Sequence, residues 1–431
     1  MIGIIGYGRS GKAVARLIES LGNTPFISEI NETISDIPYP NEVGCHSEEL
    51  LKMDLLIASP GVALGTPILK KAREKGISII GELEFASRYL KGKMVAITGT
   101  NGKTTTAVLT SKILSESNRF KRVLLGGNIY PGVPLSELVP MSNESTITVV
   151  EVSSFQLERI VDFRPNISAI ININPDHLDR YKDFKDYRSA KLNILKNQTD
   201  SDYSILNLDD ENLSSVNTRS KIFYFSMKEK ADIYYNGKYV IGSDGMVAFS
   251  IDDLFFPGNI FIEDGMVASL VGKLLGLSWE EIKNGIRLFK GVEHRMEYVI
   301  KQEDLYVINN SMCTNPIAFS KSLEAFPHCC VIVGGRMKVD SVVPIIEAIC
   351  ERATCVILLG ESSSLIERNL TKAGFERYKI ASSMVDAVRI AKDSGNNKVM
   401  LSPGGSSFDL YKNFAERGND FKKSVRAVYG G

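Results

Sequence analysis

The chain has 431 residues, and its 51 lysines and arginines are balanced by 51 aspartates and glutamates. This length exceeds one ordinary hydrophobic core and predicts two or three domains, while the neutral balance does not indicate a nucleic acid or an anionic membrane as partner. No apolar run approaches the roughly 18 residues of a membrane-spanning helix, so we expect a cytoplasmic protein. The six cysteines form neither a C-x-x-C pair nor a metal-ligand spacing and are predicted to be reduced.

The first segment, residues 1–90, alternates predicted strands and helices. Strand 2–5 runs into Gly6-Tyr-Gly-Arg-Ser-Gly11, a helix follows, and the second strand closes with Glu29. A G-x-G-x-x-G turn in a βαβ setting, with an acid about 20 positions on, predicts a nucleotide diphosphate bound at the helix N-terminus. Taken alone, the motif is as compatible with NAD as with another nucleotide. A further interpretation is that these glycines only permit tight packing.

A second turn with a glycine, Ser59-Pro-Gly61, follows the predicted strand 54–58. Because glycine carries no side chain, the backbone of this turn can also approach a ligand closely. Helix 67–75 and strand 77–80 then complete the predicted α/β half-sheet.

The central segment, residues 91–297, opens with the strongest motif in the chain. A strand over residues 94–97 runs into Thr98-Gly-Thr-Asn-Gly-Lys-Thr104, and a helical pattern follows from Thr105. Glycine-rich backbone and a helix N-terminus bind phosphate, Lys103 can reach the β- and γ-phosphates, and a following threonine can hold Mg²⁺. Because Ile97 stands at the first glycine position of the usual pattern, only the second half of that pattern matches. The residues predicted to hold a nucleoside triphosphate are Gly99, Thr100, Asn101, Gly102, Lys103, Thr104 and Thr105.

Two β-branched runs in this segment each end in polar residues. The first run, a predicted strand over residues 146–150, leads into Glu151, and the second, a predicted strand over residues 167–173, leads to His177. A carboxylate at the carboxyl end of a strand beside a phosphate loop is well placed to hold Mg²⁺, and an imidazole could serve a second metal ion. Lys191 lies in a predicted helix and, by itself, would be an ordinary solvated lysine.

The last segment, residues 298–431, again alternates strands and helices. Its strands end in polar turns that contain glycine, and in a doubly wound sheet such turns share the carboxyl edge, where ligands bind. These turns present hydroxyls, amides and Lys338 to a small anionic ligand. His294 and Arg295, just before this segment, could cover the nucleotide or could be a chance surface pair.

Taken together, these stretches resemble the Mur ligases, the ATP-dependent amide-forming enzymes of peptidoglycan synthesis, over essentially the whole chain. The resemblance implies a Rossmann-like N-terminal domain, a central P-loop ATPase-like domain with a mostly parallel sheet, and a C-terminal Rossmann-like α/β domain for the amino acid acceptor. It also implies that the first domain holds the UDP of a sugar substrate, which displaces the NAD interpretation. The resembling segments are 6–11, 59–61, 98–104, 126–128, 151–158, 176–179, 190–192, 294–295, Gly334-Gly335 with Lys338, and Ser402-Pro403 through 413–414.

The activity that the resemblance implies is addition of D-glutamate to UDP-N-acetylmuramoyl-L-alanine. The substrate carboxylate attacks the γ-phosphate to give an acyl phosphate, and the incoming amine then displaces phosphate. The implied cofactors are ATP and Mg²⁺, and Lys191 is expected to be carbamylated and so to become an anionic metal ligand.

The resemblance also implies roles for individual residues. The expected catalytic residues are Lys103, Glu151, His177 and Lys191, and the expected metal ligands are Thr104, Glu151, His177 and Lys191. Beyond the phosphate loop, Arg295 and Asn310 are expected to contact ATP. The expected substrate-binding residues are Gly8, Ser10, Glu29, Gly61, Asn128 and Ser153 for the nucleotide sugar, and Thr314, Lys338, Ser407 and Phe414 for D-glutamate.

The sequence departs from the family pattern in four places. Residues 260–264 stand where the family has His-Asn followed three residues later by Asn. Asn310 replaces an acid that would touch the nucleotide ribose, and Met312 replaces a lysine. Loss of a charge-assisted hydrogen bond would weaken nucleotide binding by about 1.5–3 kcal/mol. The segment 127–131 also strays from the usual Asn-Ile-Gly, so the acceptor could differ from the standard one.

Three alternatives remain open at this point. A divergent ligase would activate another acid, with a different amino acid acceptor or an archaeal cofactor precursor such as the nickel tetrapyrrole of methanogens as its substrate. A nucleotide-binding partner subunit would bind ATP without turnover, and a dehydrogenase would bind nicotinamide at Gly6 to Gly11. In every case we expect small-molecule substrates, no nucleic acid or membrane partner, and a monomer.

Overall fold

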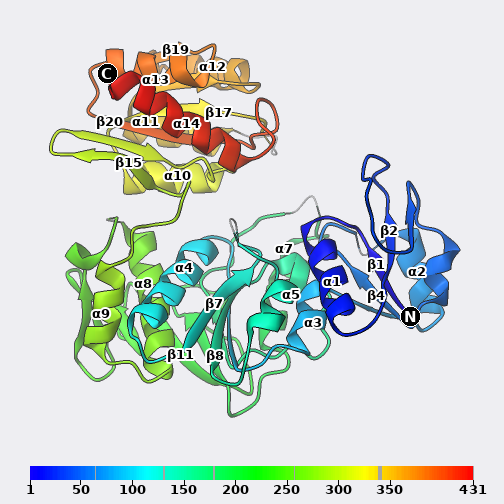
Figure 1. Cartoon of the computed structure of the whole chain (residues 1–431). Helices are drawn as coiled ribbons and strands as arrows, with labels where there is room; N and C mark the ends of the chain where they lie inside the picture. The colour runs from blue at the N-terminus through cyan, green and yellow to red at the C-terminus, as the bar shows by residue number, and fades with distance from the viewer. Residues whose placement is uncertain (64, 130–131, 178–179, 257, 338–341, 431) are drawn as a thin grey trace. The chain divides into compact units, whose positions relative to one another are not determined.

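A computed structural model provides the structure, which describes every residue except 64, 130–131, 178–179, 257, 338–341 and 431. The chain contains three β-sheets flanked by helices, as the predicted α/β class requires (Figure 1). Two compact units account for the chain: Met1–Leu254 with Ile260–Phe289, and Phe255–Asn259 with Lys290–Gly431. The first unit holds two of the three sheets, and the domain boundaries at residues 90 and 297 stay predictions.

The first sheet is fully parallel, with the strand order β3-β2-β1-β4-β5. Its strands are β1 (Ile2–Ile5), β2 (Phe26–Glu29), β3 (Asn41–Val43), β4 (Leu55–Ala58) and β5 (Ser78–Ile80). The tight turn after β1 depends on two of its glycines. Gly6 adopts φ +89°, and a Cβ on Gly11 would lie 2.0 Å from the Gly6 carbonyl oxygen, so neither position accepts a side chain without strain.

The central sheet has nine strands in the order β14-β13-β12-β11-β10-β9-β6-β8-β7. The strands are β6 (Lys93–Thr98), β7 (Arg122–Gly127), β8 (Thr146–Glu151), β9 (Ile167–Ile170), β10 (Tyr203–Asn207), β11 (Lys221–Ser226), β12 (Ile233–Tyr235), β13 (Tyr239–Gly242) and β14 (Val247–Ser250). Strands β6 to β12 pair in parallel with one another, and the antiparallel pairs are β12 with β13 and β13 with β14. Strand β6 lies between β8 and β9, so the carboxyl ends of those two strands flank the phosphate loop.

Helices cover both sheets of the first unit. They are α1 (Arg9–Ser20), α2 (Pro67–Glu74), α3 (Glu82–Ser87), α4 (Lys103–Glu116), α5 (Leu135–Leu138), α6 (Ser154–Leu157), α7 (Phe184–Leu192), α8 (Asn259–Leu274) and α9 (Trp279–Arg287), with 3-10 turns at Glu48–Lys52, Val139–Met141, Asn193–Leu195 and Ile251–Asp253. Helices α1, α3 and α5 pack against one another between the two sheets (Figure 1). One buried apolar cluster runs through them and includes Ile4, Leu83, Phe85 and Leu135, which explains why the two sheets form one compact unit.

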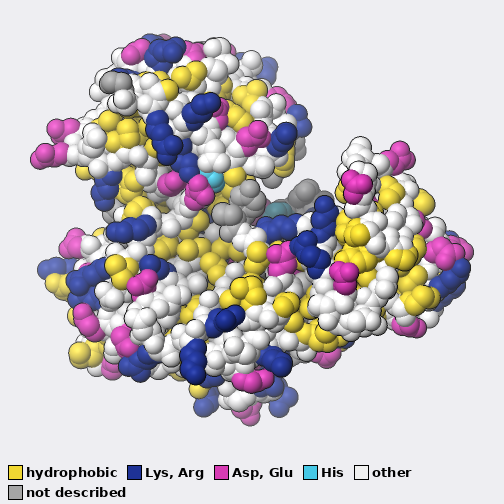
Figure 2. All heavy atoms as spheres, in the orientation of Figure 1, with side chains coloured by type: hydrophobic (Ala, Val, Ile, Leu, Met, Phe, Trp, Pro, Cys, Tyr) yellow, Lys and Arg dark blue, Asp and Glu magenta, His cyan; other side chains and the backbone are white. Residues whose placement is uncertain are grey.

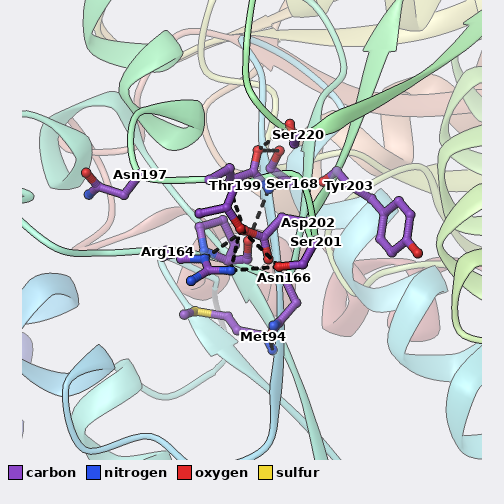
Figure 3. A network of polar contacts seen from close by, with 12 residues as sticks. Met94, Arg164, Asn166, Ser168, Asn197, Thr199, Ser201, Asp202, Tyr203 and Ser220 are labelled. Atoms are coloured by element: carbon purple, nitrogen blue, oxygen red, sulfur yellow. Dashed lines mark hydrogen bonds and ion pairs between the residues drawn. The ribbon is translucent and has the colours of Figure 1, made fainter.

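Polar contacts close the amino-terminal edge of the central sheet, opposite the phosphate loop (Figure 3). Arg164 donates hydrogen bonds to Asp202 at 2.7 Å and to Thr199 at 2.7 Å, and the Asn166 side chain accepts the Met94 N–H at 2.9 Å. These bonds satisfy groups at the starts of β6, β9 and β10, and they leave the carboxyl edge of the sheet for ligands.

The third sheet, in the second unit, has the strand order β15-β16-β20-β17-β18-β19, and only β15 pairs antiparallel. Its strands are β15 (Glu297–Gln302), β16 (Leu305–Asn309), β17 (Cys329–Gly334), β18 (Ala353–Leu359), β19 (Tyr378–Ile380) and β20 (Lys398–Gly404). Its helices are α10 (Pro316–Ala325), α11 (Val343–Arg352), α12 (Ser363–Lys372), α13 (Met384–Asp393) and α14 (Phe414–Tyr429). Within the described part of the chain, every helix is too short or too polar to cross a lipid bilayer.

Two sequence-based expectations are wrong in detail. Not all six cysteines are reduced, because Cys330 and Cys355 form a disulfide; the parallel register of β17 and β18 places them opposite each other with Cα atoms 4.6 Å apart. The strand expected over residues 167–173 ends at Ile170, because the Asn172 side chain instead bonds to the phosphate loop.

A buried carboxylate fastens α3 to the central sheet. Glu84 is fully buried, and its Oε2 accepts backbone hydrogen bonds from Val161, Asp162 and Phe163 at 2.8–3.0 Å, while Oε1 accepts one from Arg88 at 2.9 Å. Burial disfavours the charged form, but these hydrogen bonds outweigh it and lower the pKa of the Glu84 carboxyl.

We expect Glu84→Ala to lower the free energy of unfolding by about 3–4 kcal/mol, because three backbone N–H groups and Arg88 lose a buried, charged acceptor. Because the pKa of Glu84 is lowered on folding, the difference from the wild type should shrink as the pH falls below about 4. Urea unfolding at pH 7 and at low pH measures both effects. Glu144→Ala, at an exposed turn, is the matched control and should change little; equal stability of the two variants at pH 7 would contradict the assignment.

Candidate active site

The phosphate loop connects β6 to α4 at the centre of the nine-stranded sheet. Gly102 caps α4 with φ +89°, and a Cβ there would lie 2.7 Å from Oδ1 of Asp264 on α8. Glycine is therefore required at this position for both conformation and space. Lys103 is the first residue of α4, so the helix begins two residues earlier than expected and turns its N-terminus toward the loop.

The segment after β9 holds the loop in shape. The Asn172 side chain accepts the Asn101 N–H at 2.9 Å and donates to the Asn101 carbonyl at 3.3 Å. The Thr100 hydroxyl lies 3.0 Å from the Tyr187 hydroxyl of α7 and accepts the Asn174 N–H at 3.0 Å. These side-chain contacts define the shape of the loop, as a preorganised phosphate site requires.

Glu151, at the end of β8, meets the first turn of α4. Its Oε2 accepts a hydrogen bond from the Thr104 hydroxyl at 2.7 Å, and its Oε1 accepts one from the Asn128 amide at 3.3 Å. Both Glu151 and Thr104 are buried, and the neighbouring Thr105 hydroxyl has no hydrogen-bond partner in the described structure. A buried hydroxyl and carboxylate beside a phosphate loop are the hard oxygen donors that Mg²⁺ takes together with phosphate oxygens.

Two lysines share one acceptor at this loop. The Gly99 carbonyl oxygen accepts hydrogen bonds from the Lys103 ammonium at 3.0 Å and from the Lys191 Nζ at 2.7 Å. Lys191 is almost completely buried and lies 4.9 Å from the Tyr187 ring centroid. Burial first, and then the positive charge of Lys103, lower the pKa of Lys191 well below its usual value. Contrary to what its helical position suggests, Lys191 is not a solvated surface lysine.

His177 follows β9 but is less enclosed. Its φ is +54°, a strained value for histidine, and its ring packs on Phe155 at 4.8 Å between centroids. The imidazole retains 46% of its exposure and lies 3.7 Å from an oxygen of Asp176. Among the described residues, no three His, Cys, Asp or Glu side chains gather closely enough to hold a metal ion. Of the predicted metal ligands, Thr104 and Glu151 are in direct contact through the hydrogen bond at 2.7 Å.

The residues expected to hold the nucleotide sugar lie at the carboxyl edge of the first sheet and at the adjoining edge of the central sheet. Gly8 and Gly61 both face open space, and Ser10 lies in the first turn of α1. Glu29 is buried, and its two carboxylate oxygens accept the N–H groups of Tyr7 and Asn31. Its carboxylate therefore shapes the G-x-G turn directly. Figure 2 shows basic side chains gathered over the start of α1, whose exposed cations are Arg9, Lys12 and Arg16.

Two further predicted residues have structural partners of their own. Ser153 caps α6, and its hydroxyl forms a capping box with Gln156. Asn128 follows β7, with its N–H bonded to the Glu151 carbonyl at 2.8 Å. Asn128 is thus adjacent to the phosphate loop through Glu151, whereas Ser153 lies one short turn further along the chain.

The second unit places its predicted residues along one edge of the third sheet. Asn310 is buried after β16, where its amide donates to Ser402 at 3.2 Å and its oxygen accepts the Met296 N–H at 3.3 Å. Thr314 lies in the turn after β16, Ser407 is buried after β20, and Phe414 begins α14. Arg295 lies in the turn that precedes β15, and Lys338 falls outside the described residues.

Sequence reasoning missed several residues that shape the site. Asn172 and Tyr187 hold the phosphate loop, and Asp264 accepts a hydrogen bond from Thr106 of α4 at 2.7 Å. Asp264 belongs to a segment already noted for departing from the family pattern, so a signal existed there. Asn172 is a polar residue inside an apolar run, and this interruption was the signal available in the sequence.

The fold and the loop define a class: a three-sheet α/β protein whose central sheet carries a nucleoside triphosphate site. Sequence comparison narrows this class. The profile of the Mur ligase middle domain matches residues 97–267, and that of the Mur ligase MurD-like N-terminal domain matches residues 1–81. The chain belongs to the Mur ligase family, in its MurD-like branch, and is an ATP-dependent ligase.

Similar proteins extend over the whole chain. A UDP-N-acetylmuramoylalanine–D-glutamate ligase of Caldanaerobacter subterraneus is 36% identical, and one of Clostridioides difficile is 34% identical; each alignment covers 98% of this chain and 97% of the relative. Among solved structures, the UDP-N-acetylmuramate-alanine ligase MurC of Thermotoga maritima matches with a TM-score of 0.65 at 20% identity, over 99% of both chains. The MurF ligase of Thermotoga maritima in complex with ADP matches with a TM-score of 0.61 at 16% identity, over 99% of this chain and 95% of that one. These structures share the three-domain fold.

The burial of Lys191 leads to a stability prediction. In CO₂-free buffer at pH 7, Lys191→Met should stabilise the protein by about 1–3 kcal/mol, because a buried ammonium is replaced by an apolar side chain of similar length. Folding lowers the pKa of Lys191, so the folded wild type binds fewer protons than the unfolded chain. The wild type therefore gains stability as the pH rises toward about 10.4, the pKa of lysine in the unfolded chain. The amount by which Lys191→Met exceeds the wild type in free energy of unfolding should therefore shrink from pH 7 to pH 10.

Urea-unfolding midpoints at the two pH values test this prediction. Lys185→Met, at an exposed position of the same helix, should shift the midpoint little at either pH. A Lys191→Met protein that unfolds more easily than the wild type at pH 7 would show that the ammonium is stabilising instead.

Proposed function

We propose that this enzyme joins D-glutamate to UDP-N-acetylmuramoyl-L-alanine, converting ATP to ADP and phosphate, in peptidoglycan precursor synthesis. The observation that carries the chemistry is the contact of the phosphate loop with a buried carboxylate and two lysines: Thr104 to Glu151, and Lys103 and Lys191 to Gly99. The whole-length similarity to D-glutamate ligases supports the choice of substrates.

The reaction follows from this arrangement. An oxygen of the substrate carboxylate attacks the γ-phosphorus, the bond from that phosphorus to the bridging oxygen breaks, and ADP leaves. The amine of D-glutamate then adds to the carbonyl carbon of the acyl phosphate, loses a proton, and expels inorganic phosphate as the amide forms. The loop N–H groups, the N-terminus of α4 and the Lys103 ammonium stabilise the negative charge on the transferring phosphoryl group.

Magnesium fits the donors present, and Thr104, Glu151 and His177 would hold it. When bound, it would neutralise phosphate charge and polarise the phosphoryl group. We propose that Lys191 joins this set after carbamylation. With its pKa lowered, its neutral amine can add to CO₂ and lose a proton, which forms an N–C bond and turns a buried cation site into an anionic oxygen ligand.

The remaining residues complete the proposed site. We assign the nucleotide sugar to Gly8, Ser10, Gly61, Asn128 and Ser153, with Glu29 acting through the G-x-G turn. The residues assigned to D-glutamate are Thr314, Lys338, Ser407 and Phe414, and those assigned to ATP beyond the loop are Arg295 and Asn310. We propose domains at 1–90, 91–297 and 298–431, a monomer, and a cytoplasmic location, where ATP and nucleotide sugars are made.

A second candidate is a ligase of the same chemistry with another acid acceptor. Asn310 favours it, because its amide is committed to Ser402 and Met296 and carries no charge. The neighbouring Met312 likewise offers no charge to an anionic ligand.

Phosphate release tests the function. We expect steady release only when ATP, Mg²⁺, UDP-N-acetylmuramoyl-L-alanine and D-glutamate are all present, because the acyl phosphate needs both carbon substrates. Lys103→Ala should lower kcat by at least about 100-fold, since the loop loses its charge on the phosphoryl group. Turnover without the sugar or with another amino acid would instead favour the second candidate, and full activity of Lys103→Ala would refute the loop assignment.

The carbamate predicts a chemical rescue. Lys191→Ala should be inactive, and added acetate or another small carboxylate should restore part of the activity by supplying the missing anion. Lys185→Ala should keep full activity without acetate. A flat response of Lys191→Ala to acetate, together with wild-type activity that is unaffected by removal of bicarbonate, would refute the carbamate.

A further inference from the structure

The turn Ser59–Val62, which follows β4 in the first sheet, is held by two arginines from the central domain. Arg159 donates to the Ser59 carbonyl oxygen at 2.9 Å and also to the Val62 carbonyl oxygen. Arg180 donates to the Pro60 carbonyl oxygen at 2.9 Å. Three of the four carbonyls of this turn therefore accept hydrogen bonds from guanidinium groups.

Each guanidinium is itself firmly placed. Arg159 is buried, with 5% of its surface exposed. Burial lowers the pKa of its guanidinium to about 10. The positive charges of Arg180 and Arg73 act in the same direction, and the charge of Glu158 opposes them. Arg180 pairs with Glu158 at 2.8 Å and lies 4.0 Å from the ring centroid of Phe155. Such geometry fixes the turn more exactly than flexible surface contacts would.

The bond from Arg180 sets the direction of one N–H group. In a trans peptide the C=O and the following N–H point in opposite directions, so the Pro60 carbonyl directed at Arg180 points the Gly61 N–H away from it. Gly61 makes no hydrogen bond in the described structure, and a Cβ built on it would meet no atom within 4 Å. Gly61 is exposed, and its N–H is thus an available donor.

We propose that Arg159 and Arg180 are positioning residues for the nucleotide-sugar site, which aim the Gly61 N–H at an acceptor oxygen of the bound nucleotide. Two guanidiniums behind the turn also make the electrostatic potential in front of it more positive, which favours an anionic diphosphate. Polarisation of the Pro60–Gly61 peptide by Arg180 strengthens the N–H as a donor. This inference rests on the proposed nucleotide-sugar substrate.

Fastening the first sheet to the central domain is the other role that these arginines could have. That role predicts that the arginine variants are less stable and that their affinities for all ligands fall equally. The positioning role predicts a selective loss of affinity for the nucleotide sugar, while ATP affinity is spared, because the guanidinium groups bond to Ser59, Pro60, Val62 and Glu158 and not to the phosphate loop.

Calorimetric titration of the full chain separates these roles. We expect Arg180→Lys, which keeps the charge but loses the planar fork, to weaken binding of UDP and of UDP-N-acetylmuramoyl-L-alanine about tenfold, with the affinity for a non-hydrolysable ATP analogue changed less than about twofold. Arg164→Lys is the matched control, because it alters an arginine with charged and polar partners at the opposite edge of the central sheet (Figure 3). That variant should bind all three ligands as the wild type does.

Equal affinity of Arg180→Lys and the wild type for the nucleotide sugar would overturn the inference, as would a parallel loss of ATP affinity. If the wild type binds ATP but neither UDP nor the nucleotide sugar, the proposed function fails first, and this outcome is distinct from the other two.

A second measurement does not depend on the folding of an arginine variant. Labelling with ¹³C-proline and ¹⁵N-glycine selects the amides of the four Pro-Gly pairs in the sequence, and the signal missing in Gly61→Ala identifies Gly61. We expect the Gly61 amide proton of the wild type to shift downfield on saturation with UDP-N-acetylmuramoyl-L-alanine. An unchanged Gly61 signal at saturation would overturn the inference.

Discussion

The Gly99 carbonyl oxygen, which accepts hydrogen bonds from Lys103 and Lys191, is the interaction on which the rest of the site depends. It brings two lysine side chains together beside the phosphate loop, where burial and then the positive charge of Lys103 lower the pKa of Lys191. A lowered pKa favours the neutral amine that the proposed carbamylation of Lys191 requires, while the Lys103 ammonium lies beside the loop proposed to hold the triphosphate. The strained His177 and the unsatisfied Thr105 hydroxyl near the same loop fit the same purpose.

Rigid support from several directions makes this arrangement possible. Asn172 and Tyr187 fix the phosphate loop from the side of β9 and α7, and Glu151 fixes its threonine from β8. In the first sheet, the equivalent support comes from Arg159 and Arg180, which belong to the central domain. These two turns of the first unit, both proposed to bind ligands, are therefore shaped by side chains that are distant in sequence, as preorganised binding sites require.

Much of the local structure was evident from the sequence. The β-branched run before Gly99 and the helical pattern after Thr104 predicted strand, turn and helix, and the fold confirms them with boundaries shifted by one or two residues. Burial of Lys191 could not be predicted in this way, because a lysine on a nine-residue helix looks the same whether its face is solvated or covered. Nor could the pairing of Cys330 with Cys355, which follows from the register of two strands.

By itself, the sequence determined the family, the α/β class, the phosphate loop and the identity of its lysine and threonines, because these features are encoded in short runs of adjacent residues. Only the tertiary structure decided that Lys191 meets Gly99, that Glu84 anchors α3, and that Arg180 holds Pro60. The physical reason is that such contacts join residues far apart in the chain. They depend on strand order and on which helix faces are buried, and neither is specified by the pattern of any single segment.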